Sequence, residues 1–284
     1  MIAARLSDCR RDGGMRIAFR LFVLGAVVVF TAGGLTGMSQ GRANDPARKP
    51  TEWEKKGWRL TFRDEFGGVG LDRAKWNDCY WHGRTHGNEL QYYAPDGLEV
   101  SGGVLRLKAE KRRYEGHEYT SGMITSLGKF EQRYGLFEIR AKFPKGKGYW
   151  PAFWLLPTSR RWPPEIDVLE ILGHEPNKVY MTVHWRDEQG KHVFHSMNWV
   201  GPDFSADFHT FAVEWKPEEI IWYVDGVERA RTDKGVPHQP MYLIANLAVG
   251  GSWPGSPDES TRFPGFMEID YIRAYARPTQ AQGK

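Results

Sequence analysis

The sequence predicts an all-β fold, and three observations support this. Apolar and polar residues alternate along short segments such as 104–110 ("VLRLKAE") and 137–143 ("FEIRAKF"), which is the period of strands with one buried face. Glycine, proline and Asp-Gly pairs separate these segments at short intervals. No helical pattern of about ten residues is present. Because there is also no repeat of solenoid or propeller period, we expect one two-sheet sandwich.

The remaining strands follow in chain order. Residues 181–185 ("MTVHW") alternate, and 211–230 ("FAVEWKPEEIIWYVDGVERA") predict two successive hairpins with turns at 216–219 and 225–226. Residues 266–276 ("FMEIDYIRAYA") predict one more strand. An open sandwich leaves one polar sheet face concave, so we expect a groove for a long ligand.

The chain divides into four parts. Residues 1–43 contain a basic region, an apolar run and a small-residue site before Asn44, which together predict a cleaved signal peptide. Met15 is a second possible start, and an uncleaved membrane anchor is the alternative to cleavage. Residues 44–56 are charged and contain proline, so we expect a linker, followed by one folded domain over 57–277 and a flexible tail over 278–284. Such a protein would be secreted or periplasmic, with no membrane attachment after cleavage.

Composition limits the partners. Six arginines precede residue 44, and the rest of the chain is close to neutral, so the sequence does not indicate nucleic-acid binding. Aromatic residues make up 14% of the chain, including 12 tryptophans, more than a core usually needs. Exposed rings stack on sugar faces, so a polysaccharide is the expected partner of a protein that we expect to be a monomer.

The strongest functional signal is "EIDVLE" at 165–170. Glu165 and Asp167 share one face of a strand, but Glu170 lies five positions after Glu165 and would point into the core. A single β-bulge near Val168–Leu169 restores the parity and places Glu170 beside the other two acids. The spacing therefore predicts a bulge at a candidate active site.

Three crowded carboxylates raise one another's pKa. A retaining glycosidase needs this arrangement, with one ionised nucleophile and one protonated acid roughly 5–5.5 Å apart. Asp167, between the two glutamates, could hold a shared proton. A solvated acidic strand edge or a calcium site is the alternative interpretation of three acids alone.

Neighbouring residues favour a sugar site. Trp150 and Trp154 in "GKGYWPAFWLLP" fall on one strand face, as stacking platforms would, although either could belong to the core. Arg140 and His184 fall on the polar faces of their predicted strands. His184 alone would carry little weight, since a single histidine is more often structural.

At this point the sequence resembles glycoside hydrolase family 16, especially its laminarinase-like members. The motifs that carry the resemblance include "GNELQYY" (87–93), "TSGMITS" (120–126), "YGLFEIRAKFPKGKGYWPAFWLLP" (134–157), "EIDVLE" (165–170), "NLAVGGSWPG" (246–255) and "MEIDYIRAY" (267–275). They span about residues 58–276. The resemblance implies a concanavalin A-like β-jelly-roll sandwich with a concave cleft that hydrolyses β-glycans internally with retention.

The resemblance also implies roles for individual residues. Glu165 corresponds to the nucleophile, Asp167 to the assisting acid and Glu170 to the acid/base. The positions that line the subsites correspond to Asn88, Arg140, Trp150, Trp154 and His184. No cofactor is required for catalysis. A structural calcium is implied on the convex side, with Asp270 as side-chain ligand and backbone carbonyls near Glu65 and Gly103.

Two departures concern the cleft mouth. Pro164 precedes the nucleophile position where these enzymes usually have glycine, and the segment from Pro157 to Glu165 is short. The leading expectation is a secreted endo-β-1,3- or β-1,3(4)-glucanase. One alternative is an enzyme that depolymerises a bacterial exopolysaccharide, and another is a non-catalytic β-glucan-binding protein, which would not need three repelling acids.

Overall fold

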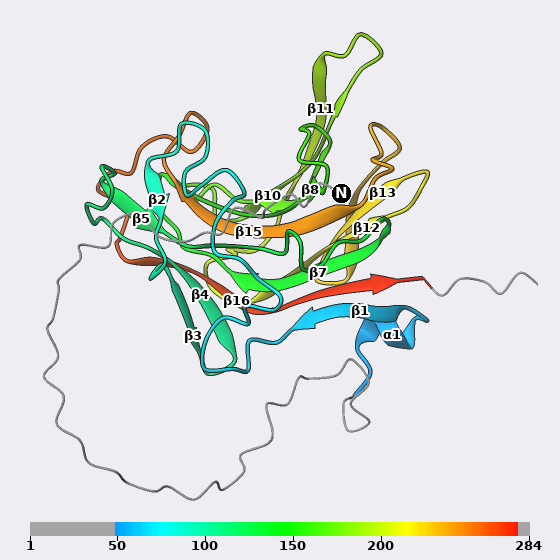
Figure 1. The fold of residues 1–284 in the computed structure, drawn as a ribbon, viewed down its shortest axis with the longest axis horizontal. Coiled ribbons are helices and arrows are strands. Elements are labelled where there is room, and N and C mark those ends of the chain that lie inside the picture. The colour runs from blue at the N-terminus through cyan, green and yellow to red at the C-terminus, as the bar shows by residue number, and fades with distance from the viewer. Residues whose placement is uncertain (1–48, 278–284) are drawn as a thin grey trace, which may run out of the picture.

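The computed structural model of the protein describes residues 49–277 and is built from β-strands in two stacked sheets (Figure 1). The predicted signal peptide, residues 44–48 of the predicted linker and the predicted tail lie outside the described residues. The eight-stranded sheet has the order β14 (Val227–Thr232), β13 (Ile220–Val224), β12 (His209–Trp215), β7 (Gly135–Lys142), β16 (Gly265–Ala276), β4 (Val104–Ala109) and β3 (Leu98–Ser101), with β1 (Arg59–Asp64) also paired to β16.

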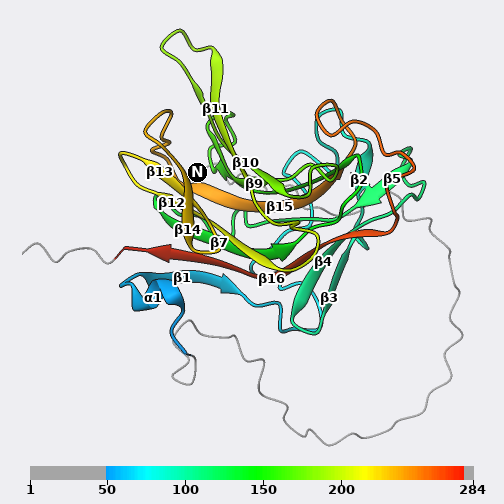
Figure 2. The same ribbon diagram turned by 180° about the vertical axis from the view of Figure 1, so that it is seen from behind.

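The six-stranded sheet has the order β11 (His192–Val200), β10 (Lys178–Arg186), β9 (Glu165–Glu170), β8 (Tyr149–Pro157), β15 (Met241–Val249) and β6 (Met123–Thr125). A short parallel pair joins β2 (Gln91–Tyr93) and β5 (Tyr119–Ser121). The six-stranded sheet is curved, and its concave side faces away from the eight-stranded sheet (Figures 1 and 2). The all-β sandwich prediction is confirmed.

The main core lies between the two sheets. Strand alternation supplies it, since Leu105 and Leu107 of β4 are fully buried. Phe137 of β7 and Phe153 of β8 belong to the same cluster from opposite sheets. Burying apolar surface at about 25 cal/mol per Å² makes this cluster the dominant stabilising contribution. It also fixes which side chains of each strand face outward.

The predicted hairpins are confirmed. β12 pairs with β13, and β13 pairs with β14, both antiparallel, through turns at residues 216–219 and 225–226. Asp225 and Gly226 both adopt positive φ, as an Asp-Gly turn requires. The final predicted strand is β16, which pairs with β7 on one side and with β4 and β1 on the other.

Residues 51–56, which were expected to be linker, instead pack on the outer face of the eight-stranded sheet. Thr51 caps a short helix, α1 (Glu52–Lys55), through a capping box with Glu54. Trp53 is 7% exposed, and its Nε1 donates a 2.5 Å hydrogen bond to the buried Glu138 of β7. The ordered domain therefore begins before residue 57, because one buried tryptophan anchors this polar segment.

One hairpin extends beyond the sandwich. β10 and β11 pair over nine residues each, and their connecting end projects away from both sheets on the concave side (Figures 1 and 2). Within residues 49–277, no helix has the length and hydropathy needed to cross a membrane.

Candidate active site

The register of β9 against its neighbours contains the predicted bulge. Asp167 pairs with Thr182 of β10, and Glu170 pairs with Tyr180. Two residues of β9 therefore lie opposite the single residue Met181. The pairing of β8 with β9 shifts at the same place. This two-against-one arrangement is a β-bulge, so the prediction is confirmed.

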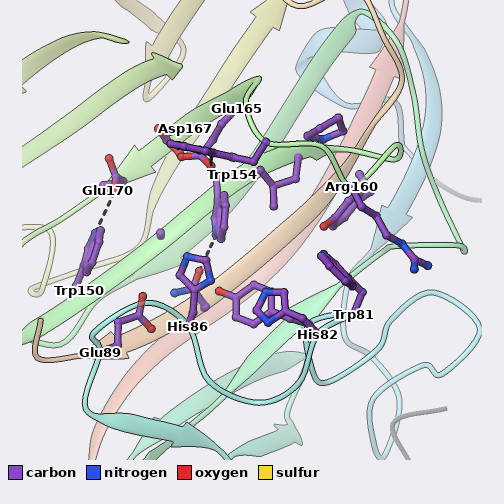
Figure 3. A pocket seen from close by; sticks show the side chains of 17 residues that line it. Trp81, His82, His86, Glu89, Trp150, Trp154, Arg160, Glu165, Asp167 and Glu170 are labelled. Carbon is purple, nitrogen blue, oxygen red and sulfur yellow. Dashed lines mark hydrogen bonds between the residues drawn. The ribbon is translucent and has the colours of Figure 1, made fainter. Parts of the chain in front are cut away.

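The bulge turns two consecutive side chains inward. Val168 and Leu169 are 2% and 0% exposed, and both belong to the main core. Glu165, Asp167 and Glu170 consequently point to the concave side and line one cavity of about 370 Å³ (Figure 3). The acids thus depend on the packing of the strand that carries them.

Glu165 lies in a set of directed contacts. Its side chain is 14% exposed. Trp162, in the loop that precedes β9, donates a 2.8 Å hydrogen bond from Nε1 to Oε2 of Glu165. On the other oxygen, Oε1, His184 Nε2 lies 3.5 Å away. Both contacts favour an ionised carboxylate that is held in one orientation.

Asp167 is the most buried of the three acids, with 4% of its side chain exposed. Its Oδ2 atom makes no hydrogen bond, although Nε2 of His184 lies 3.3 Å away. His184 Nδ1 in turn lies 3.0 Å from Nε2 of His192 on β11. The Asp167 backbone carbonyl accepts a 2.8 Å hydrogen bond from Trp222 of the other sheet. Asp167 is therefore rigidly placed with one oxygen directed at an ionisable neighbour.

Glu170 is held at the far end of the strand. Trp150 of β8 donates a hydrogen bond of 3.1 Å from Nε1 to Oε1 of Glu170 (Figure 3). This contact gives Trp150 a polar role in the site, and its stacking on a sugar remains a prediction. The position of Trp150 on the cleft face agrees with its predicted parity.

The three carboxyl groups all bind protons more tightly than free acids. Burial raises the pKa of Glu165 to about 8, and the charge of Asp167 adds to this, whereas His184 and Trp162 lower it. Burial also raises the pKa of Asp167 to about 8. The pKa of Glu170 is raised well above its ordinary value by burial first and by Asp167 and Glu165 second. Burial, more than the repulsion that the sequence suggested, is the larger cause.

The opposite wall of the cavity is aromatic. It comes from the loop that precedes β2, where Tyr80 and His82 stack with ring centroids 5.1 Å apart. The ring centroids of His86 and Tyr80 lie 6.2 and 6.3 Å from the ring centroid of Trp154 on β8. Trp154 is only 7% exposed and belongs to a second apolar cluster, so it is both a cavity wall and a core residue.

A buried polar network fixes this wall. Trp154 Nε1 donates a 2.7 Å hydrogen bond to Oδ1 of Asn246 on β15. Asn246 Nδ2 in turn donates a 3.1 Å hydrogen bond to the hydroxyl of Tyr93. That hydroxyl donates a 3.2 Å hydrogen bond to Oε2 of Glu89, which also accepts a hydrogen bond from Gln91. Burial raises the pKa of Glu89 to about 7. The network orients the indole and places a fourth acid at the cavity.

Comparison with known proteins decides the family. The model for Glycosyl hydrolases family 16 matches residues 86–273. The chain belongs to glycosyl hydrolase family 16. It is therefore a hydrolase of glycosidic bonds that resembles endo-β-glucanases.

Several relatives are similar over most of this chain. A beta-glucanase from Rhodothermus marinus is 40% identical over 246 residues, which cover 77% of this chain and 85% of the relative. The endo-1,3-1,4-beta-glycanase ExsH of Rhizobium meliloti is 39% identical over 241 residues, 76% of this chain and 51% of that protein. This chain thus spans about half of the Rhizobium relative.

Solved structures agree with the fold. The catalytic domain of an endo-1,3-beta-glucanase (laminarinase) from Thermotoga petrophila is 38% identical with a TM-score of 0.69, and the match covers 78% of this chain and 98% of that one. The non-specific endo-beta-1,3(4)-glucanase SCLam gives a TM-score of 0.70 at 31% identity. This match covers 78% of this chain and 92% of the SCLam chain. The sandwich of this family 16 enzyme is accordingly a β-jelly roll.

Arg140 does not lie at the cleft of this family 16 enzyme. It is on β7 of the eight-stranded sheet, and its Nη1 forms a 2.7 Å ion pair with Oδ2 of Asp270 on β16. The expectation that Arg140 contacts substrate was therefore wrong. Alternation placed the residue on an outward face, but the sandwich has two outward faces and Arg140 occupies the convex one.

The same ion pair bears on calcium. Asp270 lies where the pairing of β16 with β7 shifts register, and its carboxylate is 36% exposed. Calcium at Asp270 would require Arg140 to leave that carboxylate, so the convex calcium site remains a prediction. Among the described residues, the one group of three or more potential metal-ligating side chains is Glu165, Asp167 and His184, with ligand atoms within 4.8 Å of one another.

Asn88 is placed near the cleft without lining the cavity. It is exposed, and its Nδ2 donates a 2.5 Å hydrogen bond to Ser252 in the loop after β15. The two residues that flank it closely, His86 and Glu89, do line the cavity. Asn88 therefore links two rim loops in this structure, and its contact with sugar remains a prediction.

Several cavity residues were missed by the sequence analysis. These residues lie either in loops or on a strand whose sequence shows no distinctive pattern. They are Tyr80, Trp81, His82, His86, Glu89, Arg160, Trp162, Tyr242 and Asn246. Glu89 and Asn246 stood inside motifs that carried the family resemblance. Trp162, three positions before Glu165, could have been found as a ring donor within reach of the nucleophile position.

Proposed function

We propose that this family 16 enzyme is a retaining endo-β-glucanase that cleaves β-1,3- or mixed β-1,3/1,4-glucans inside the chain. Relatives described as a beta-glucanase, an endo-1,3-1,4-beta-glycanase and a laminarinase support this substrate class. The open cavity along the concave sheet, walled by aromatic rings, suits a chain that extends past both ends of the site.

In the first step, Glu165 attacks the anomeric carbon and forms an ester bond to it. The glycosidic C–O bond breaks at the same time, and Glu170 gives its proton to the departing oxygen. The raised pKa of Glu170 supports this role because it favours the protonated form that a general acid needs. The leaving half of the polysaccharide departs as an alcohol.

In the second step, the ionised Glu170 takes a proton from a water molecule. The water oxygen attacks the anomeric carbon and displaces Glu165, so the second inversion restores the β configuration. Asp167 stays beside Glu165 throughout and holds or releases a shared proton as the charge on Glu165 changes.

The bulge at Val168–Leu169 is the observation that carries this mechanism. It places Glu170 in the same cavity as Glu165, whereas a regular strand would bury it. Proton NMR of the first product released from a β-glucan tests the proposal. Retention requires the β-anomer to appear first, and an initial α-anomer would rule out Glu165 as nucleophile.

Substrate choice needs a direct assay. We expect reducing sugars to be released from laminarin or barley β-glucan, with a rapid fall in viscosity that marks internal cleavage. Agarose and a bacterial exopolysaccharide serve as comparison substrates. Hydrolysis of the exopolysaccharide in preference to both glucans would replace the proposed substrate by the second candidate.

Export and a monomeric state belong to the same proposal. The motive for export is the charge and apolar pattern of residues 1–43. N-terminal sequencing of released material should give a start near Asn44. Recovery of residues 21–35 in a membrane fraction would contradict cleavage, and light scattering at the mass of a dimer would contradict the monomer.

A further inference from the structure

Three arginines lie in or against the loop that leads to Glu165. Arg160 lines the cavity itself, whereas Arg186 lines a separate pocket beside Pro163 and Pro164. Arg160 and Arg161 lie in the loop between β8 and β9, and Arg186 ends β10. Arg186 is tied to that loop, because its Nη2 donates 3.1 Å to the carbonyl of Trp162. All three are exposed. We call Arg160, Arg161 and Arg186 the arginine rim.

The arginine rim has no acidic partner among residues 49–277, since none of its members forms an ion pair there. Asp187, which follows Arg186 in the hairpin, forms no ion pair with it. Asp187 accepts hydrogen bonds from the backbone of Gln189 and Lys191 instead. Arg186 itself donates to two backbone carbonyls. The rim thus presents three guanidinium groups that form no ion pair among residues 49–277.

Other cations close to the cleft in sequence behave differently. Lys142, Lys145 and Lys147, in the segment that leads into β8, each lie within ion-pair distance of a carboxylate, at 2.5, 3.3 and 3.8 Å. Clustered basic residues are the feature that an anionic polysaccharide requires. The structure places such a cluster at the rim and neutralises the lysines.

Aromatic surface accompanies the charge. Trp81 and Trp162 are 44% and 46% exposed. The guanidinium of Arg160 lies 5.5 Å from the centre of the Trp81 ring. Figure 3 shows Arg160 and Trp81 at one end of the cavity, opposite the end that holds Glu170 and Trp150. An exposed ring beside a guanidinium can hold a sugar face and its charged substituent together.

The charges of Arg160 and Arg186 affect the pKa values of neighbouring residues. Burial raises the pKa of Tyr242 to about 12, and the charge of Arg160 opposes that rise. The pKa of His192 is lowered by burial first, and then by His184 and Arg186. Burial also lowers the pKa of His82, which favours its neutral form. The arginines, rather than the histidines, therefore supply the charge at this end of the cavity near neutral pH.

We propose that the arginine rim binds an anionic substituent on the polysaccharide, a carboxylate or a sulfate ester, at a sugar beyond the Glu165 end of the cleavage site. The planar guanidinium fork matches the oxygens of either group and forms paired hydrogen bonds to them. This inference rests on the proposed glucanase function and narrows its substrate to an acidic β-glucan. A neutral glucan would leave the rim without a partner.

Binding tests the inference without turnover. The Glu165→Gln protein is titrated by calorimetry with β-1,3-glucan fragments of one length, unmodified, carboxymethylated or sulfated. The same titrations are repeated after adding Arg160→Gln, Arg161→Gln and Arg186→Gln together. The matched control adds Arg113→Gln, which removes an exposed arginine paired with Glu118 outside the cavity.

We expect the Glu165→Gln protein to bind an anionic fragment about tenfold more tightly than the neutral one, because each guanidinium that meets an anionic group adds a favourable Coulomb interaction. The triple change should remove that preference, and the Arg113→Gln control should keep it. The anionic fragment that binds more tightly shows whether the rim prefers a carboxylate or a sulfate ester. Equal binding of neutral and anionic fragments, or equal loss in the control, would overturn the inference. A wild-type enzyme that cleaves no β-glucan would instead refute the proposed function. The ratio of the two binding constants is measured without turnover, so the two failures can be told apart.

Discussion

The indole Nε1 of Trp162 donates a 2.8 Å hydrogen bond to Oε2 of Glu165, only three residues further along the chain. The loop that carries Trp162 therefore supports the proposed nucleophile directly. The hydrogen bond lowers the pKa of Glu165, although burial and Asp167 raise it more. The loop between β8 and β9 thus helps to set how easily Glu165 ionises.

We expect Trp162→Phe to move the acidic limb of the pH profile of kcat/KM to higher pH. Removing the N–H donor raises the pKa of Glu165, and the nucleophile must be ionised to attack. At pH 5 the loss should be about tenfold, since hydrogen bonds to charged groups contribute roughly 1.5–3 kcal/mol. Trp81→Phe, which removes an indole at the same end without touching Glu165, is the control. An unshifted acidic limb would refute this role.

The two glutamates should respond differently to truncation. Glu165→Ala should abolish turnover, whereas Glu170→Ala should spare aryl β-glucosides with good leaving groups, which need no protonation. Added azide should rescue Glu170→Ala and yield a β-glycosyl azide, because the anion replaces the water that Glu170 would activate. Asp167→Asn should cost less than either glutamate change. An α-glycosyl azide from Glu170→Ala together with a β-glycosyl azide from Glu165→Ala would exchange the assigned roles, because azide that replaces the nucleophile attacks the α face.

The buried acids should reduce stability at high pH. An acid whose pKa is raised on folding binds a proton more tightly in the folded state, so stability falls as pH rises from the unfolded value near 4.5 towards about 8. Glu165→Gln mimics the neutral form at every pH. We therefore expect it to raise Tm by about 5 °C at pH 8.5 and much less at pH 5, given about 2–4 °C per kcal/mol for a domain of this size.

Differential scanning calorimetry across pH 5–9 measures this effect. Glu218→Gln, at an exposed position, serves as the control and should leave Tm unchanged at both ends of the range. A stabilisation by Glu165→Gln that is the same at every pH would contradict the argument. Only 14% of the Glu165 side chain is exposed, which is why its ionisation is coupled to folding.

Calcium gives a separate thermal test. If calcium binds Asp270 and nearby carbonyls, 5 mM calcium should raise Tm relative to chelator, because a ligand of the folded state stabilises by mass action. The gain should disappear in Asp270→Asn. Since Arg140 holds the same carboxylate, Arg140→Gln should strengthen calcium binding. Identical melting curves with calcium and with chelator would remove the site.

The amino-terminal anchor should matter for stability. Trp53→Ala removes a buried indole and one of the two side chains, Trp53 and Tyr271, that hydrogen-bond to the buried Glu138 carboxylate. We expect a loss of about 3–5 kcal/mol in the free energy of unfolding, typical of a large buried aromatic residue. Urea unfolding of this variant and of Glu52→Ala, an exposed surface change with only an ion pair to Lys55, separates the two effects. A loss below 1 kcal/mol would mean that α1 is a loosely attached linker.

The sequence predicted the strands well because burial of one face imposes a period of two. The hairpins through 216–219 and 225–226 followed from the same rule and from turn residues. The period could not say which sheet a strand joins. Arg140 and His184 both face outward, but only His184 lies in the six-stranded sheet beside the acids.

Within the candidate site, the acids of β9 and the tryptophans of β8 were predictable, whereas the loop residues and Tyr242 and Asn246 of β15 were not. Glu170 was placed correctly because its wrong parity required a bulge. Trp81 and Arg160 come from loops, where no period constrains the side chains. Their meeting depends on tertiary packing of segments about 80 residues apart, which local patterns do not encode.

The single extra residue in β9 has a consequence for how cleft shapes diversify. Deleting Leu169 would leave Glu165, Asp167 and the final glutamate at strictly alternating positions, so all three would still face the groove. The inserted residue is therefore unnecessary for presenting the acids. It changes how far Glu170 stands along the strand and how sharply the strand bends there. One codon gained or lost at this point can thus reshape the groove while every reactive group stays in place.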